Sequence, residues 1–220
     1  IKGDFTAARD AGGDGAVNIV VNDVVTAAQG ATIAGATTGT VDFSLGLSDT
    51  MANLLNDGGT AVHANLTAAA NADGDPNVNV TVGAGTLTVA KLNLIKAATN
   101  GTITASISGT ANALTSLNTV ATDAITMTVT NAEVTAADLA TIDGKTSVAV
   151  AANAVTKITG SDTEVRAALT ADGNNTLVID TDFDTDVSGD LTVADAKIIA
   201  EATSGTVDFT GTITDDADNF

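Results

Sequence analysis

The sequence predicts an α/β repeat fold, a solenoid of stacked strand–helix–strand–helix units with parallel β-strands. The first observation is a motif, (Val/Leu)-Thr-(Ala/Val)-Ala, that occurs four times in the 220 residues. Its threonines are Thr26, Thr88, Thr135 and Thr192, which lie 62, 47 and 57 residues apart. The second observation is a strand-like alternation before each motif, and the third is a helical pattern after it. Internal repetition at such periods is typical of solenoids and arrays.

The first element of each unit is predicted to be a strand. Apolar residues alternate with polar or small ones, which is the two-residue period of a strand with one buried face. The alternating residues are Val17/Ile19/Val21, Val78/Val80/Val82, Ile125/Met127/Val129 and Leu177/Ile179. The connections between strands are long enough for helices, so we expect the strands to be parallel.

The second element is a helix that begins at the motif threonine. We expect each threonine to be an N-cap, because Gln29, Asp138 or Asp195 follows three residues later in three of the four copies. Four residues after the threonine comes Gly30, Leu92, Leu139 or Ala196, and an isoleucine always follows after seven. These spacings place both residues on one helix face. The sequence therefore predicts one buried column of Ile33, Ile95, Ile142 and Ile199.

A glycine is expected to end this helix in the left-handed conformation. It follows thirteen residues after three of the threonines, as Gly39, Gly101 and Gly205. In the third unit we align Gly144, nine residues after Thr135, which implies a deletion of about one helical turn.

The third and fourth elements are a second strand and a second helix. The second strands contain Val41–Leu45, Ile103–Ile107, Val148–Val150 and Val207–Phe209, and we expect Val41, Ile103, Val148 and Val207 to form another buried column. A capping box at Ser161–Glu164 marks the start of a second helix. The repeat units then cover approximately residues 1–16 (partial), 17–77, 78–124, 125–176 and 177–220. Residues 57–75 form the longest insertion.

Composition excludes several function classes. The formal net charge is −19, from 27 acidic and 8 basic residues, so the chain lacks the lysine and arginine that nucleic-acid binding requires. There is no cysteine, which excludes disulfides and thiolate chemistry. No run of about 18 apolar residues is present, so we expect no membrane insertion. The single histidine, His63, lies in the insertion without a recognisable nucleophile motif, and we assign it no catalytic role.

One acidic run is a candidate metal site. Asp180, Asp182, Asp184, Asp186 and Asp190 lie within eleven residues. In an extended segment, alternation would place four of these carboxylates on one side, where they repel one another unless a cation is bound. Calcium prefers such oxygen ligands, although the run lacks the glycine and glutamate of an EF-hand loop. These five residues are therefore a candidate calcium site, and the alternative, which we favour, is a solvated acidic surface.

A resemblance supports this interpretation. The segment Val134-Thr-Ala-Ala-Asp-Leu-Ala-Thr-Ile-Asp-Gly-Lys-Thr146 and the segments Ala-Thr-(Asn/Ser)-Gly-Thr at residues 98–102 and 202–206 resemble repeats of very large bacterial extracellular proteins. The most similar repeats are those of marine cyanobacteria, which are often found beside calcium-binding RTX-type segments. The resemblance implies an extracellular or cell-surface location and a structural or adhesive role. It implies no catalytic residues.

The expected function is therefore non-enzymatic: a structural repeat protein of an extracellular filament, sheath, surface layer or adhesin rod. The alternative is a carbohydrate-binding or carbohydrate-cleaving extracellular solenoid, which requires carboxylates that converge on one cleft. Ile1–Thr6 aligns with Ile158–Thr163, and Phe220 lies just past the same phase of the repeat. We therefore expect the ends, near Ile1–Phe5 and Asp208–Phe220, to stack head-to-tail on another copy or to continue into a longer repeat chain.

Overall fold

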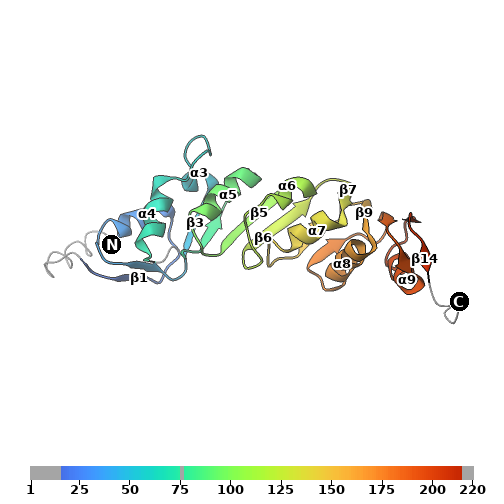
Figure 1. Cartoon of the computed structure of the whole chain (residues 1–220). Coiled ribbons are helices and arrows are strands. Elements are labelled where there is room, and N and C mark those ends of the chain that lie inside the picture. Colours follow the sequence, from blue (N-terminus) through green and yellow to red (C-terminus); the bar gives the residue numbers. More distant parts are fainter. Residues whose placement is uncertain (1–15, 75–76, 215–220) are drawn as a thin grey trace. The chain divides into compact units, whose positions relative to one another are not determined.

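The computed structural model describes residues 16–74 and 77–214. It has an α/β fold with parallel strands, and the chain divides into two compact units, residues 1–106 and 107–220 (Figure 1). The strand β5 (Ile103–Gly109) runs across the boundary between them. The predicted ends at Ile1–Phe5 and beyond Thr214 lie outside the described residues.

Unit 1 contains two sets of parallel strands. Strand β1 pairs with β2, with Ile19 opposite Val41. Strand β4 lies between β3 and β5, with Val80 opposite both Leu47 and Ile103. The elements before β5 are β1 (Ile19–Val21), α2 (Ala27–Ala34), β2 (Val41–Phe43), β3 (Leu47–Asp49), α3 (Met51–Leu54), α4 (Ala64–Ala72), β4 (Val80–Val82) and α5 (Val89–Ala97).

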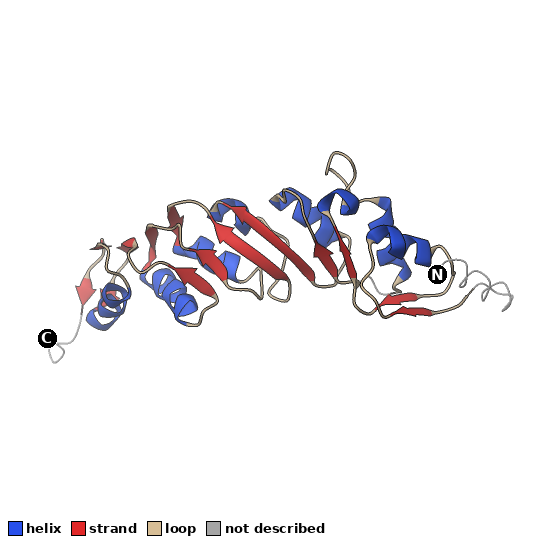
Figure 2. Cartoon of the chain, turned by 180° about the vertical axis from the view of Figure 1, so that it is seen from behind, coloured by secondary structure: helices blue, strands red, loops and turns tan. Residues whose placement is uncertain are grey.

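Unit 2 contains three sets of parallel strands: β6–β8–β10, β7–β9–β11–β13 and β12–β14. Helices α7, α8 and α9 pack in sequence along them, and they lie on one side of the strands (Figures 1 and 2). The elements after β5 are α6 (Ala111–Thr115), β6 (Ala124–Val129), β7 (Glu133–Thr135), α7 (Ala136–Asp143), β8 (Val150–Ala152), β9 (Lys157–Ser161), α8 (Asp162–Gly173), β10 (Leu177–Ile179), β11 (Asp184–Ser188), β12 (Leu191–Thr192), α9 (Val193–Ala202), β13 (Val207–Phe209) and β14 (Ile213–Thr214).

The helix starts predicted from the sequence are confirmed. The four motif threonines are N-caps, and their hydroxyls accept the N–H three residues later at 3.2, 3.4, 3.0 and 3.1 Å in chain order. Complete capping boxes are present at Thr26/Gln29 and Ser161/Glu164. A threonine N-cap satisfies one of the amides that a helix start leaves without a partner, so the motif fixes where each helix begins.

The core consists of small and aliphatic side chains, as the composition suggests. The four isoleucines of the helix pattern are all buried, and Ile125, Met127 and Val129 of β6 are fully buried on the same side of their strand. Small residues allow close packing: a β-carbon on Gly30 of α2 would lie 3.0 Å from Ala69 Cβ of α4. Because interiors are closely packed, this position has room for little more than hydrogen.

The prediction of one isoleucine column is wrong in unit 2. Helix α8 packs against both α7 and α9, so it separates the helices that carry Ile142 and Ile199. The reason is that the strand-to-strand step is 22 to 33 residues, which is about half of the sequence period. In residues 17–176, both halves of each sequence repeat therefore contribute a strand and a helix to the packing.

The alignment of the third unit is also corrected. Helix α7 has eight residues, as α2 does, so no helical turn is deleted. Gly144 directly follows α7 as its C-cap, as Gly35 follows α2. Val148 is only half-buried, and Val150, two residues later, is the fully buried strand residue in the place of Val41. Val207 was also expected to be buried and is half-buried.

Candidate functional site: strand clasps and the aspartate-rich strand

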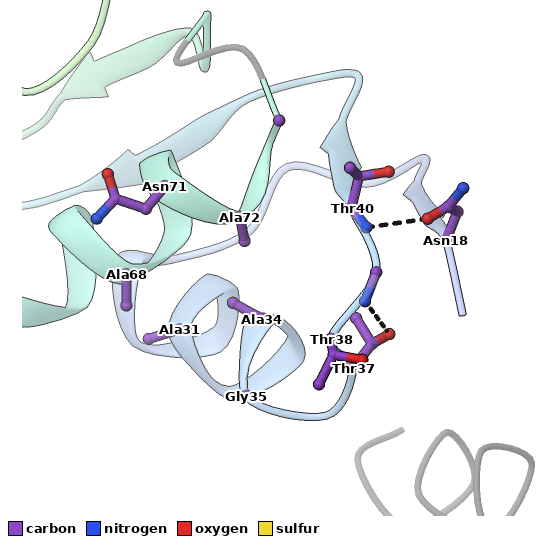
Figure 3. A pocket seen from close by; sticks show the side chains of 12 residues that line it. Asn18, Ala31, Ala34, Gly35, Thr37, Thr38, Thr40, Ala68, Asn71 and Ala72 are labelled. Carbon is purple, nitrogen blue, oxygen red and sulfur yellow. Dashed lines mark hydrogen bonds between the residues drawn. The ribbon is translucent and has the colours of Figure 1, made fainter. Parts of the chain in front are cut away.

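A threonine two residues before each predicted glycine links neighbouring strands in unit 1. The Thr37 hydroxyl donates to the Val17 carbonyl at 2.5 Å. The same hydroxyl accepts the Gly39 N–H at 2.9 Å (Figure 3). The Thr99 hydroxyl donates to the Val78 carbonyl at 2.6 Å and accepts the Gly101 N–H at 3.0 Å. We term this arrangement a strand clasp, because one hydroxyl joins the first residues of a strand, or the chain just before them, to the chain before the neighbouring strand.

Unit 2 contains the same strand clasp twice. Thr203 donates to the Phe183 carbonyl and accepts the Gly205 N–H at 3.0 Å. Thr146 donates to the Ile125 carbonyl at 2.7 Å and accepts the N–H of Val148 at 3.1 Å. Each buried or half-buried hydroxyl thus satisfies a carbonyl and an amide that flank the sheet, where polar groups without partners are costly.

The clasp glycines serve close backbone approach and do not end helices in the left-handed conformation. A β-carbon on Gly39, Gly101 or Gly205 would lie under 3.0 Å from a carbonyl oxygen of the neighbouring strand segment. None of the three has a positive φ, so the prediction of left-handed helix ends is wrong at these positions. In the third clasp Val148 stands in the place of the glycine, and its spacing from Thr135 is the same thirteen residues.

A second polar link lies beside the clasps. The side-chain oxygen of an Asn or Asp at the start of a strand accepts the N–H of a threonine 22 or 23 residues later, in the pairs Asn18–Thr40 (3.0 Å, Figure 3), Asn79–Thr102 (2.8 Å), Asp184–Thr206 (2.7 Å) and Asp190–Thr212 (2.8 Å). We term these residues Asx acceptors. Sequence reasoning missed them, although each donor threonine follows a glycine in a recurring Gly-Thr pair.

The structure does not gather the five predicted calcium ligands into one cluster. Of this run, only Asp184–Ser188 is an extended strand. Asp184 is exposed, whereas Thr185 and Val187, which alternate with the aspartates along the strand, are fully buried. Asp180 accepts the Thr181 N–H in the preceding turn, and Asp182 is exposed. Asp190 follows Gly189, whose φ of +91° turns the chain. Within residues 16–74 and 77–214, no group of three or more acidic or histidine side chains is placed to hold a metal ion.

Besides Asp180, three of these carboxylates have protein partners. Asp184 and Asp190 are Asx acceptors, and Asp186 forms an ion pair with Lys157 of β9 at 2.7 Å. The hydrogen bond with Asp186 raises the pKa of Lys157 above its usual value, and the charge of Asp186 adds to the effect. Backbone amides and one lysine therefore meet part of the requirement that we had assigned to calcium.

Helices α8 and α9 are joined by an arginine. Arg166 donates to both carboxylate oxygens of Asp162 at 2.7 and 2.6 Å and lies 3.3 Å from Asp195 of α9. The hydrogen bond from Arg166 lowers the pKa of Asp162. At the same helix start, the Ser161 N–H and hydroxyl lower the pKa of Glu164. These charges lie at a helix start and at the contact between two helices, which they stabilise.

His63 has a structural role in the described residues. It is the N-cap of α4, and its Nδ1 accepts the Asn65 N–H at 3.1 Å. An accepting nitrogen at this place satisfies a free helix amide, as the threonine hydroxyls do elsewhere.

The surface carries shallow grooves with few chemically active groups. One of them, of about 620 Å³, lies at the ends of α2 and α4 and is lined by alanine, glycine, asparagine and threonine (Figure 3). Two others, of about 330 and 320 Å³, each contain one carboxylate, Asp57 and Asp143 respectively. None of these three grooves holds the two carboxylates that glycoside cleavage requires.

Across the part of the chain that the structure describes, no helix is long and apolar enough to cross a bilayer.

The chain was compared with known proteins in three ways. A scan against protein-family models, a search of curated proteins and a search of solved structures each found no match.

Proposed function

We propose that this chain is a structural element: a solenoid of stacked strand–helix units that forms part of an extracellular filament, sheath, surface layer or adhesin rod. The observation that carries the proposal is the recurrence of the strand clasp in both units. In each of the four clasps, a threonine two residues before the clasp glycine, or before Val148 in the third, joins a strand to its neighbour. A chain whose recurring polar residues serve contacts between neighbouring elements is typical of repeat proteins, in which each unit contacts mainly the next.

The distribution of carboxylates favours this proposal over a carbohydrate-cleaving enzyme. Asp49 is buried and accepts N–H groups from Ala27, Thr50 and Asn53 at 3.1, 2.9 and 2.7 Å. Asp184 and Asp190 accept backbone amides between strands. These acidic groups serve local backbone contacts in different parts of the chain, so they are not available as an acid and a base around one substrate.

Calcium remains part of the proposal as a bridging ion for Asp180, Asp182, Asp184, Asp186 and Asp190. Packing many copies with a net charge of −19 accumulates repulsion, and a divalent cation would relieve it. Because the five side chains do not converge within one chain, the ion would bind them in part through water or between copies. We expect it to stabilise the assembly more than the single chain.

The test of the structural role is self-association of the purified chain. Sedimentation velocity over a concentration series should show species that grow with concentration, and electron microscopy should show them as linear assemblies. Association should strengthen as salt rises from 0.02 to about 0.5 M, because screening reduces repulsion between acidic copies. A single monomeric species at every concentration and salt level, or cleavage of a polysaccharide by the chain, would contradict the proposal.

A further inference from the structure

The second strand clasp contains the one Asn-Gly dipeptide of the sequence, Asn100-Gly101. The other clasps have a threonine or a serine at the place of the asparagine: Thr38, Ser147 and Ser204. An asparagine differs from these residues because the backbone nitrogen of the next residue can attack its amide carbon. Glycine hinders this attack least, since it has no side chain and adopts many backbone conformations. The second clasp therefore carries a reactive pair that the others lack.

The nitrogen that would attack is held by the clasp. Gly101 is buried, and its N–H donates to the Thr99 hydroxyl at 3.0 Å. The Gly101 carbonyl accepts a hydrogen bond from the Lys96 ammonium at 3.1 Å, which holds the same residue from its other side. Attack requires the Gly101 nitrogen to give up its proton and to bond to the Asn100 side chain. The hydrogen bond to Thr99 must therefore break first.

The packing around Gly101 also opposes the reaction while the clasp is closed. A β-carbon on Gly101 would lie 2.4 Å from the carbonyl oxygens of Asn77 and Val78. The attack forms a five-membered ring in which a carbonyl carbon replaces the Gly101 hydrogen. That carbon would press on the hydroxyl of Thr99, which is only 3% exposed. Asn100 itself is exposed, so water reaches the ring once the clasp has opened.

We propose that Asn100 is a self-modification site that the second strand clasp keeps unreacted. When the clasp opens, the Gly101 nitrogen bonds to Asn100 Cγ and the bond from Cγ to the side-chain nitrogen breaks. Ammonia leaves with the proton of the Gly101 N–H, and a succinimide ring remains. Water then opens the ring at either carbonyl and yields aspartate or isoaspartate at position 100. The reaction needs only water, and the inference does not depend on the proposed function.

The isoaspartate product prevents the clasp from closing again. Its main chain runs through the former side chain, so one carbon, about 1.5 Å of chain, is added between positions 100 and 101. Gly101 has no room for even a β-carbon, so a shift of this size does not fit beside the Val78 carbonyl. The modification thus makes a transient opening of the β4–β5 contact permanent.

The rate of the reaction in the folded and unfolded chain is the first test. Trypsin releases the peptide 97–145, and mass spectrometry detects the replacement of the amide by an acid and assigns it to Asn100. In one mildly alkaline buffer, the folded chain should react about tenfold or more slowly than the chain unfolded in urea. The reason is that breaking a buried hydrogen bond lowers the open population by about this factor. Equal rates in the two states would overturn the proposal, and this comparison needs no variant.

Threonine variants separate the second clasp from general destabilisation. Thr99→Val should raise the rate in the folded chain about fivefold or more, whereas Thr99→Ser keeps the hydroxyl and should leave it within about twofold. Thr37→Val removes the hydroxyl of the first clasp in the same unit and should also leave the rate within about twofold. Circular dichroism confirms that the variants fold. Equal acceleration by Thr37→Val and Thr99→Val would overturn the role of the second clasp.

Refolding tests the consequence of the modification. A chain that has reacted in urea is refolded beside Asn100→Ser after the same treatment, since serine precedes the clasp glycine in the fourth clasp. Asn100→Ser should regain its melting temperature, whereas the reacted chain should melt lower and exchange the amide hydrogens of β5 faster. Full recovery of both chains would refute the permanent opening. None of these measurements involves self-association, so the proposed function stands or fails separately.

Discussion

The strand pair β1–β2 at the start of the described chain and the pair β11–β13 near its end share one register but differ in chemistry. Both place residues 22 positions apart opposite each other, as in Ile19–Val41 and Thr185–Val207. The Asx acceptor of β1–β2 is the neutral Asn18, whereas that of β11–β13 is the charged Asp184. Val41 is fully buried and Val207 is half-buried. The comparison shows that clasps and acceptors set the register locally, whereas burial depends on what packs over the strand, which for β2 is helices α2 and α4.

The largest effect should come from adding a β-carbon to a clasp glycine. Gly101→Ala should destabilise unit 1 by about 3 kcal/mol, because a buried β-carbon would press on the carbonyls of Asn77 and Val78. Gly205→Ala should cost less, about 1 to 2 kcal/mol, because β13 has one neighbour among the described residues and can shift. Urea denaturation of the two variants measures the difference.

Val148→Ala is the control for this pair, because the third clasp already holds a β-carbon at that place. It should cost about 1 kcal/mol or less. Equal costs at Gly101 and Gly205 would mean that the second neighbour of a strand does not restrain it.

The clasp hydroxyls should follow the same order with smaller costs. Thr99 is 3% exposed, so Thr99→Val leaves the Val78 carbonyl and the Gly101 amide without this partner in a buried place, at a cost of about 2 kcal/mol. Thr203→Val should cost about 1 kcal/mol, because Thr203 is only half-buried and water replaces the hydroxyl. Thermal unfolding of both variants, with Thr99→Ser as a control that keeps the hydroxyl, provides the measurement. A smaller cost for Thr99→Val than for Thr203→Val would contradict the role of burial.

The two capping boxes should differ in their response to pH. Gln29 closes the box of α2 and does not titrate, whereas Glu164 closes that of α8 and has a lowered pKa. A lowered pKa in the folded state means that the stabilisation is present above the ordinary value of 4.5 and is lost as pH falls through the folded value. Ser161→Ala should cost about 1 kcal/mol at pH 7 and less in acid, while Thr26→Ala should have a nearly constant cost. Unfolding at pH 7 and pH 3 distinguishes them; a constant cost for Ser161→Ala would refute the assignment.

The smallest effect is expected when the Asx acceptors of unit 2 are made like those of unit 1. Asp184→Asn with Asp190→Asn keeps the accepting oxygen and removes two charges, so stability should change by less than about 0.5 kcal/mol in high salt and rise slightly in low salt.

The double variant Asp184→Asn with Asp190→Asn also tests calcium binding. If the ion bridges Asp180–Asp190, chelation should lower the melting temperature of assemblies of the unmodified chain, with calcium restoring it better than magnesium, and the variant should respond less. Melting and assembly that ignore the chelator would remove calcium from the proposal and leave the structural role.

Helix starts were predictable because their signals are local. The threonine N-caps and the two capping boxes depend on residues within three positions of each other, and all are confirmed. The burial of the helix isoleucines was also predictable from spacing alone. Parallel pairing followed from the length of the connections.

Long-range features were not predictable in the same way. Short strands such as β7, β9 and β12 contain few residues and have no alternation long enough to detect, so their positions depend on a neighbour that sequence does not reveal. The sequence predicts left-handed helix ends at the clasp glycines, because glycine serves both a left-handed backbone conformation and the close approach of a neighbouring backbone. Only the position of the Val17 or Phe183 carbonyl distinguishes these two roles. The aspartate run was expected to be one extended segment, but Gly189 turns the chain within it.

The constant 22- or 23-residue step has an evolutionary consequence. It joins β1 to β2, β4 to β5, β6 to β8 and β11 to β13, whereas the step from β3 to β4 is 33 residues and includes the loop between α3 and α4. An insertion in that loop lengthens a connection without moving a clasp, at a cost that grows slowly with length. Inside the clasped step the length varies by only one residue, because a larger change would move the clasp threonine away from the carbonyl that its hydroxyl binds. Natural variation in length among descendants of this sequence should therefore accumulate in one half of the repeat, and the thirteen-residue interval from threonine to clasp should persist after most residue identities have changed.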